Sequence, residues 1–116
     1  MITDYIDKII NGNCVDVMKQ LPDNSIDLVV TSPPYDNLRT YKGYTFPFED
    51  IVAQLYRIIK EGGVVVWVVS DATVNGSETC TSFRQALTFV AKGFKLHDTM
   101  IFQKTNPVPQ IYRKRY

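Results

Sequence analysis

Apolar and polar residues follow one another along the chain in patterns that predict strands and helices in turn. Residues 26–30 and 64–69 are compact apolar runs, typical of parallel strands that are covered on both faces. Between them, apolar residues recur at helical spacing from position 48 to 60, and Glu61-Gly62-Gly63 supplies a stop for that helix. The centre of the chain is therefore predicted to form a β-α-β unit.

The flanking segments extend this order in both directions. We predict a short strand at residues 6–11, a helix at residues 15–21, a helix at residues 82–91 and a longer strand at residues 96–104. The resulting β-α-β-α-β-α-β order predicts an α/β sandwich with a mainly parallel sheet. In such a fold, ligands bind outside the carboxyl ends of the strands.

Composition narrows the class of protein. The 116 residues are 45% hydrophobic, which suits one domain with a modest core. No apolar run reaches the roughly 18 residues of a membrane span, and the polar N-terminus lacks the regions of a signal peptide. We therefore expect a soluble, cytoplasmic protein. Cys14 and Cys80 stand apart from each other and from His97, so we expect buried free thiols and no metal site.

Positive charge gathers near the end of a chain whose formal net charge is only +1. Residues 104–116 contain no acidic residue, and their basic and aromatic side chains are Lys104, Tyr112, Arg113, Lys114, Arg115 and Tyr116. Such a segment suits contacts with phosphates and bases. A solvated tail is an equally good interpretation of this charge pattern.

The loop Thr31-Ser32-Pro33-Pro34-Tyr35 follows the first buried strand and carries the candidate chemistry. Two consecutive prolines restrict the backbone, so the loop should be stiff. The Ser32 hydroxyl and the Pro33 carbonyl are two acceptors suited to one NH2 group, and the Tyr35 ring is suited to stack on a base. Taken alone, however, the same residues also fit a simple turn at the end of a strand.

The sequence around this loop indicates its function. The stretch from Asn11-Gly12-Asn13-Cys14-Val15 through Leu21-Pro22-Asp23-Asn24-Ser25 to the loop resembles the amino-terminal block of β-class DNA amino-methyltransferases. Residues 55–63, 64–69 and 94–107 are similar to later segments of the same family. The resemblance implies a Rossmann-like class I methyltransferase fold and methyl transfer from S-adenosylmethionine to an exocyclic amine of adenine (N6) or cytosine (N4), in the setting of restriction and modification.

The resemblance also assigns roles to particular residues. It implies a catalytic loop made of Ser32, Pro33, Pro34 and Tyr35. It places Asn13, Cys14 and Thr31 at the cofactor, although Asn13 stands where the family commonly has aspartate and so offers an acceptor without a charge. No metal is implied.

The DNA partner must present its target base flipped out of the duplex, because the amine is inaccessible inside the stack. The residues expected to contact the DNA or the flipped base are Arg39, Tyr41, Lys42, Phe102 and Lys104. For any one residue of the 36–44 loop, an ordinary surface position is an equally good interpretation.

The same resemblance implies that residues 1–116 are part of a catalytic domain. A glycine-rich strand-to-helix turn of the Phe-x-Gly-x-Gly kind is missing, as is most of the target-recognition region. In the family fold, the missing part supplies strands next to the one that bears Ser32. Exposed strand edges favour association, so we expect homo-oligomers, a complementary polypeptide or a longer protein.

Three hypotheses about the function remain open from the sequence. The first is DNA methylation, with adenine N6 and cytosine N4 both compatible with Ser32. The second is methylation of an amine in RNA or protein. The third is a non-catalytic fragment that binds nucleic acid.

Unpaired strand edges lead to a testable prediction. The isolated chain is expected to elute from size-exclusion chromatography as a dimer or larger species, because open edges pair with one another. Light scattering on the eluted peak measures the mass. A stable monomer with full methyl-transfer activity would contradict the expectation.

Overall fold

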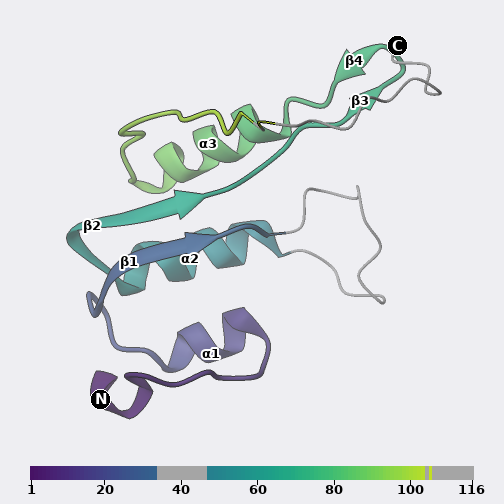
Figure 1. Cartoon of the computed structure of the whole chain (residues 1–116). Coiled ribbons are helices and arrows are strands. Elements are labelled where there is room, and N and C mark those ends of the chain that lie inside the picture. The colour runs from purple at the N-terminus through teal and green to yellow at the C-terminus, as the bar shows by residue number, and fades with distance from the viewer. Residues whose placement is uncertain (34–46, 104, 106–116) are drawn as a thin grey trace.

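The protein is described by a computed structural model that covers residues 1–33, 47–103 and 105 (Figure 1). In chain order, the elements are the 3-10 helix η1 (Ile2–Tyr5), α1 (Cys14–Gln20), β1 (Ile26–Thr31), α2 (Phe48–Ile58), β2 (Ile59–Trp67), β3 (Thr73–Val74), β4 (Ser77–Glu78) and α3 (Thr81–Lys92).

The two longer strands, β1 and β2, pair in parallel and form the centre of the fold. Leu28 pairs with Val64, and the register continues to Thr31 beside Trp67. Because parallel neighbours need a crossover, α2 connects the two strands. The predicted β-α-β unit is therefore confirmed.

The turn from α2 into β2 differs from the sequence prediction. The helix ends at Ile58, and Ile59 is already extended, with φ −72° and ψ 138°. Gly62 does have a positive φ of 81°, but it lies inside β2. Between the Ile26–Ile59 and Leu28–Val64 pairs, two steps along β1 match five along β2. Gly62 thus provides the left-handed residue at this irregularity of the strand.

The core lies between one face of this sheet and the three helices. Val15 of α1 and three residues of α2 form its buried centre, and Val29 and Val65 of the sheet pack against it. On the opposite face, Leu28 is 58% exposed and Val30 is 65% exposed. The expectation that both faces of the strands would be covered is therefore wrong for the described residues, whose helices gather on one side.

An aromatic cluster joins α3 to this core. The Trp67 ring centroid lies 5.0 Å from that of Phe89 and 5.7 Å from that of Phe48, both in tilted or edge-on arrangements. Trp67 also donates its indole N–H to the buried Gln85 side chain at 2.9 Å. The indole N–H of this partly buried ring is thus satisfied, and the hydrogen bond adds to the ring packing that joins α3 to the end of β2.

The outer helices agree with the sequence prediction. Asn13 caps α1, since its side-chain oxygen accepts hydrogen bonds from the backbone of Val15 and Asp16 at 3.0 and 3.3 Å. Gly93 ends α3 with a φ of 131°. Between β2 and α3, the short hairpin β3–β4 turns at Asn75 and Gly76, both with positive φ.

Both terminal strand predictions are wrong. Residues 6–11 form no strand, and the Ile9 side chain is fully exposed. Residues 94–103 also form no helix or strand, and Ile101 is 91% exposed, whereas Lys104 lies outside the described residues. An apolar run becomes a strand only when a neighbouring strand accepts its hydrogen bonds. In the described part of the chain, neither segment has such a neighbour.

The cysteines also depart from expectation. Cys14 and Cys80 are free thiols, as predicted, but both are exposed. Cys14 is the first residue of α1, and Cys80 immediately precedes α3.

The two neighbouring glycines of β2 provide a matched test of this fold. A Cβ on Gly63 would meet the carbonyl oxygens of Lys60 and Asp27 at 2.9 and 3.0 Å, whereas one on Gly62 meets nothing within 4 Å. We expect Gly63→Ala to destabilise the chain by about 2–3 kcal/mol through overpacking against backbone. Gly62→Ala should cost about 1 kcal/mol, from its positive φ alone.

Urea denaturation followed by fluorescence of Trp67, the single tryptophan, measures both variants. Equal losses for the two substitutions would contradict the close approach of Gly63 to β1.

Candidate functional site

The carboxyl ends of β1 and β2 lie side by side and carry the start of the candidate loop. Thr31 ends β1, and its carbonyl accepts a hydrogen bond from the backbone N–H of Val68 at 2.9 Å, just beyond the end of β2. Ser32 follows and is exposed, and Pro33 is partly buried. The two strands therefore stay paired up to the residue from which the loop departs, which gives Ser32 a rigid base.

The residues after β2 anchor α3 at the same edge. Both carboxylate oxygens of Asp71 accept hydrogen bonds from Ser82, one from the backbone N–H and one from the hydroxyl, each at 2.7 Å. Ser82 lies in the first turn of α3, where such a cap satisfies an otherwise unpaired donor. Asp71 thus has a structural task, because it anchors the start of α3 to the segment after β2.

Of the predicted cofactor residues, Asn13 and Cys14 lie at the start of α1. Figure 1 shows this start of α1 and the carboxyl end of β1 on the same side of the turn that joins the two elements. The oxygen of Asn13 is engaged in the helix cap, and its NH2 group is chemically a donor. This NH2 group is thus chemically suited to a ring-nitrogen acceptor.

The predicted base-packing residue Phe102 is not part of this assembly. It lies in the irregular segment after α3, and its side chain is 86% exposed. Six other predicted site residues lie outside the described residues: Pro34, Tyr35, Arg39, Tyr41, Lys42 and Lys104. Among the predicted positions, the structure therefore brings together Thr31, Ser32 and Pro33, with Asn13 and Cys14 at the same end.

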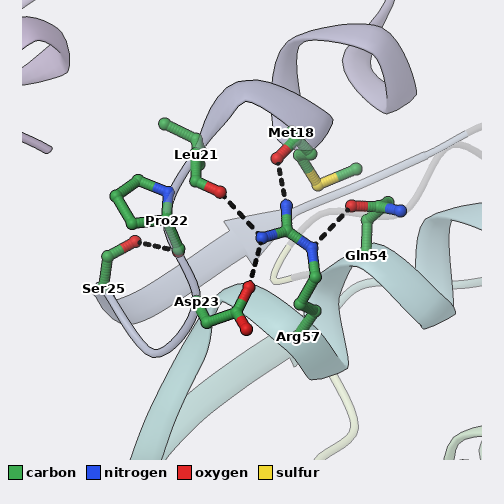
Figure 2. Close-up of polar contacts among 7 residues, drawn as sticks. All are labelled: Met18, Leu21, Pro22, Asp23, Ser25, Gln54 and Arg57. Atoms are coloured by element: carbon green, nitrogen blue, oxygen red, sulfur yellow. Dashed lines mark hydrogen bonds and ion pairs between the residues drawn. The ribbon is translucent and has the colours of Figure 1, made fainter. Parts of the chain in front are cut away.

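Sequence reasoning overlooked Arg57, which makes the densest polar contacts in the described part of the chain. Figure 2 shows its guanidinium between α1 and α2, with hydrogen bonds to Met18, Leu21, Asp23 and Gln54. An arginine in the last turn of a helix is a common sequence feature, so only its partners mark it as unusual.

An apolar hollow lies at the amino ends of β1 and β2, opposite the end from which the loop departs. Its volume is about 480 Å³, and its lining includes Ile26 and Lys60 from the first residues of the two strands. The ammonium of Lys60 pairs with the Asp27 carboxylate at 3.0 Å nearby. This hollow is separate from the loop, which leaves from the far end of β1.

Two kinds of feature were also sought in the described residues. No group of three or more His, Cys, Asp or Glu side chains is arranged there to hold a metal ion. Within residues 1–33, 47–103 and 105, no helix has the length and apolar character to cross a membrane.

Comparison with known proteins adds named relatives. The chain is 63% identical over 86 residues to the orphan methyltransferase M.BamHII of Bacillus amyloliquefaciens. The match covers 74% of this chain and 32% of that protein. The type II methyltransferase M.BglII of Bacillus subtilis is 39% identical over 72 residues, covering 56% of this chain and 20% of that protein. The chain therefore spans about a third or less of the length of these relatives.

A more distant relative covers more of the chain. The type II beta methyltransferase M.BslI of Bacillus sp. (strain NEB-606) is 29% identical over 116 aligned positions, and the match covers 86% of this chain and 13% of that protein. No solved structure matches the chain.

A family model connects these relatives to the site. The model described as DNA methylase, which represents N6 and N4 methyltransferases, matches residues 26–116. The match begins with β1 and includes the whole Thr31–Tyr35 loop. Since the matched residues make up most of the chain, this protein belongs to the DNA methylase family of N6/N4 amino-methyltransferases.

Proposed function

We propose that this chain carries the acceptor-base side of the active site of a DNA methyltransferase. The enzyme transfers a methyl group from S-adenosylmethionine to the exocyclic amine of adenine (N6) or cytosine (N4). The observation that carries the proposal is the position of Ser32 and Pro33 directly after β1, in a chain that the DNA methylase model matches from residue 26 onward. The names of the relatives support a role in modification alongside restriction.

The chemistry assigned to this chain is the activation of a weak nucleophile. The cofactor supplies an electrophilic methyl group on a positively charged sulfur. The lone pair of the base amine is delocalised into the ring, and acceptors on both N–H groups favour a more tetrahedral nitrogen. Ser32 Oγ and the Pro33 carbonyl supply these acceptors, and the Tyr35 ring stacks on the base.

The remaining roles follow from the family resemblance. Asn13, Cys14 and Thr31 contact the cofactor, and Asn13 does so through its NH2 group, because its oxygen caps α1. Arg39 and Lys42 bind phosphates beside the flipped base, and Lys104 and the aromatic residues Tyr41 and Phe102 contact the extruded nucleotide.

The surrounding architecture belongs to the same proposal. Residues 1–116 form part of a Rossmann-like class I methyltransferase domain, to which other strands and the glycine-rich cofactor turn contribute. The parallel β1–β2 pair with helices on one face supports this placement. The enzyme acts on DNA in the cytoplasm, as an oligomer, with a complementary polypeptide or as part of a longer protein.

Substitutions in the loop test the proposal. We expect Ser32→Ala to lower kcat about 100-fold, because one preorganised polar contact at the reacting centre is lost. Tyr35→Ala should lower kcat as well, and the thermal midpoint should stay unchanged in both variants. The measurement is transfer of a labelled methyl group from S-adenosylmethionine to duplex DNA, followed by identification of the methylated base.

Two preparations make this assay decisive. One is the chain alone, and the other is a chimera in which the chain replaces the matching segment of M.BamHII. Ser77→Ala is the matched control, since Ser77 is an exposed serine of β4, in the hairpin between β2 and α3. DNA binding without methyl transfer in both preparations would favour a non-catalytic binding role, and transfer to RNA or protein alone would change the substrate.

A further inference from the structure

The helix α1 and the strand β1 are two arms that meet at a turn, residues 21–25. In Figure 1 the turn lies at the left of the view, and both the start of α1 and the carboxyl end of β1 lie to its right. The proposed cofactor residues Asn13 and Cys14 are on the first arm, and Ser32 follows the second. The angle between the two arms therefore sets how the cofactor side of the site faces the loop.

The Arg57 side chain ties the end of α1 to the turn where the two arms meet. Its Nη2 donates to the Met18 carbonyl of α1 at 2.6 Å, and its Nη1 donates to the carbonyl of Leu21, which caps that helix, at 2.8 Å. Nη1 also donates to the Asp23 carboxylate in the turn at 2.7 Å (Figure 2).

The guanidinium is itself held in place on α2. Its Nε donates to Gln54 Oε1 at 3.1 Å, one turn earlier on the same helix. The Arg57 side chain is 29% exposed, so most of it lies between the helices. A planar fork fixed at Nε presents its other donors in set directions, which a flexible ammonium cannot do.

The two arms depend on Arg57 to different degrees. The start of β1 has attachments of its own, because Asn24 and Ser25 donate backbone hydrogen bonds to the carbonyls of Arg57 and Ile58 at 3.0 and 2.7 Å. β1 is also paired with β2 along its length. α1 is a helix of seven residues whose only buried side chain is Val15. Loss of the guanidinium should therefore loosen α1 and leave β1 in register.

We propose that Arg57 is a positioning residue for cofactor binding, which it supports by fixing the orientation of α1 relative to β1. The inference rests on the proposed function, which places Asn13 and Cys14 at the cofactor. Seven helical residues span about 10 Å, so a tilt of about 6° at the turn moves the start of α1 by about 1 Å. A displacement of that size at a reacting or binding group is enough to reduce rates by up to about 100-fold.

The test compares Arg57→Met with Lys60→Met in the full chain and in the chimera with M.BamHII, because the proposed glycine-rich cofactor turn comes from outside residues 1–116. Both substitutions replace a cation that makes an ion pair, but Lys60 pairs with Asp27 at the surface of the sheet and makes no hydrogen bond to α1. Equilibrium dialysis with labelled S-adenosylmethionine measures the Kd. We expect Arg57→Met to raise the Kd about tenfold and Lys60→Met to change it less than twofold.

Hydrogen exchange resolves where the structure loosens. In Arg57→Met, amides of α1 should exchange about tenfold faster, whereas those of β1 and α2 should keep their protection. Arg57→Lys keeps the charge without the fork and should show an intermediate Kd. Asp23→Asn should stay close to the unsubstituted chain, because Asp23 is 69% exposed and contributes little through its charge.

Each alternative result overturns the inference in a recognisable way. An unchanged Kd in Arg57→Met shows that α1 keeps its orientation without the guanidinium. Faster exchange in α1, β1 and α2 together shows a general contribution to stability in place of a positioning role. If neither the unsubstituted chain nor the unsubstituted chimera binds S-adenosylmethionine, the cofactor side of the proposed function fails, and this inference falls with it.

Discussion

The buried stripe of α2 is the contact on which the other elements depend. Ile51, Leu55 and Ile58 lie on this stripe and are at most 8% exposed, and together with Val15 they form the centre of the core. The sheet, α1 and the aromatic residues of α3 all pack against this one helix. Because α2 also connects the parallel strands, burial of its apolar face and pairing of β1 with β2 stabilise the same arrangement.

Polar contacts then act at opposite ends of this packed unit. Arg57 joins α1 to the turn at the amino end of β1, and Asp71 joins the end of β2 to α3 at the carboxyl end. Each satisfies donors or acceptors that a helix terminus leaves unpaired. The Ser32 loop departs from the carboxyl end of β1. At this end of the sheet, β1 is paired with β2, and the segment after β2 caps the start of α3. This is the kind of rigid scaffold on which loops carry binding and catalysis.

Much of the central fold was predictable from local pattern, and the ends were not. The strands and helices between residues 14 and 93 follow hydrophobic periodicity and turn residues, so α1, β1, α2, β2 and α3 agree with the expected order. The segments 6–11 and 96–103 were also expected to form strands, but they lack a neighbouring strand in the described residues. Strand formation depends on that neighbour, because backbone hydrogen bonds in a sheet are made between segments.

The sequence by itself determined the chemistry of the candidate site. Ser32 and Pro33 supply acceptors, the prolines restrict the loop, and the surrounding blocks identify the family. Tertiary structure alone decided which other residues support that site. Arg57 reaches Met18 and Leu21 across 39 and 36 positions of chain, and Asp71 reaches Ser82 across 11. Such contacts form only after apolar packing has brought the segments together, because a hydrogen bond depends on distance and direction that residue order does not specify.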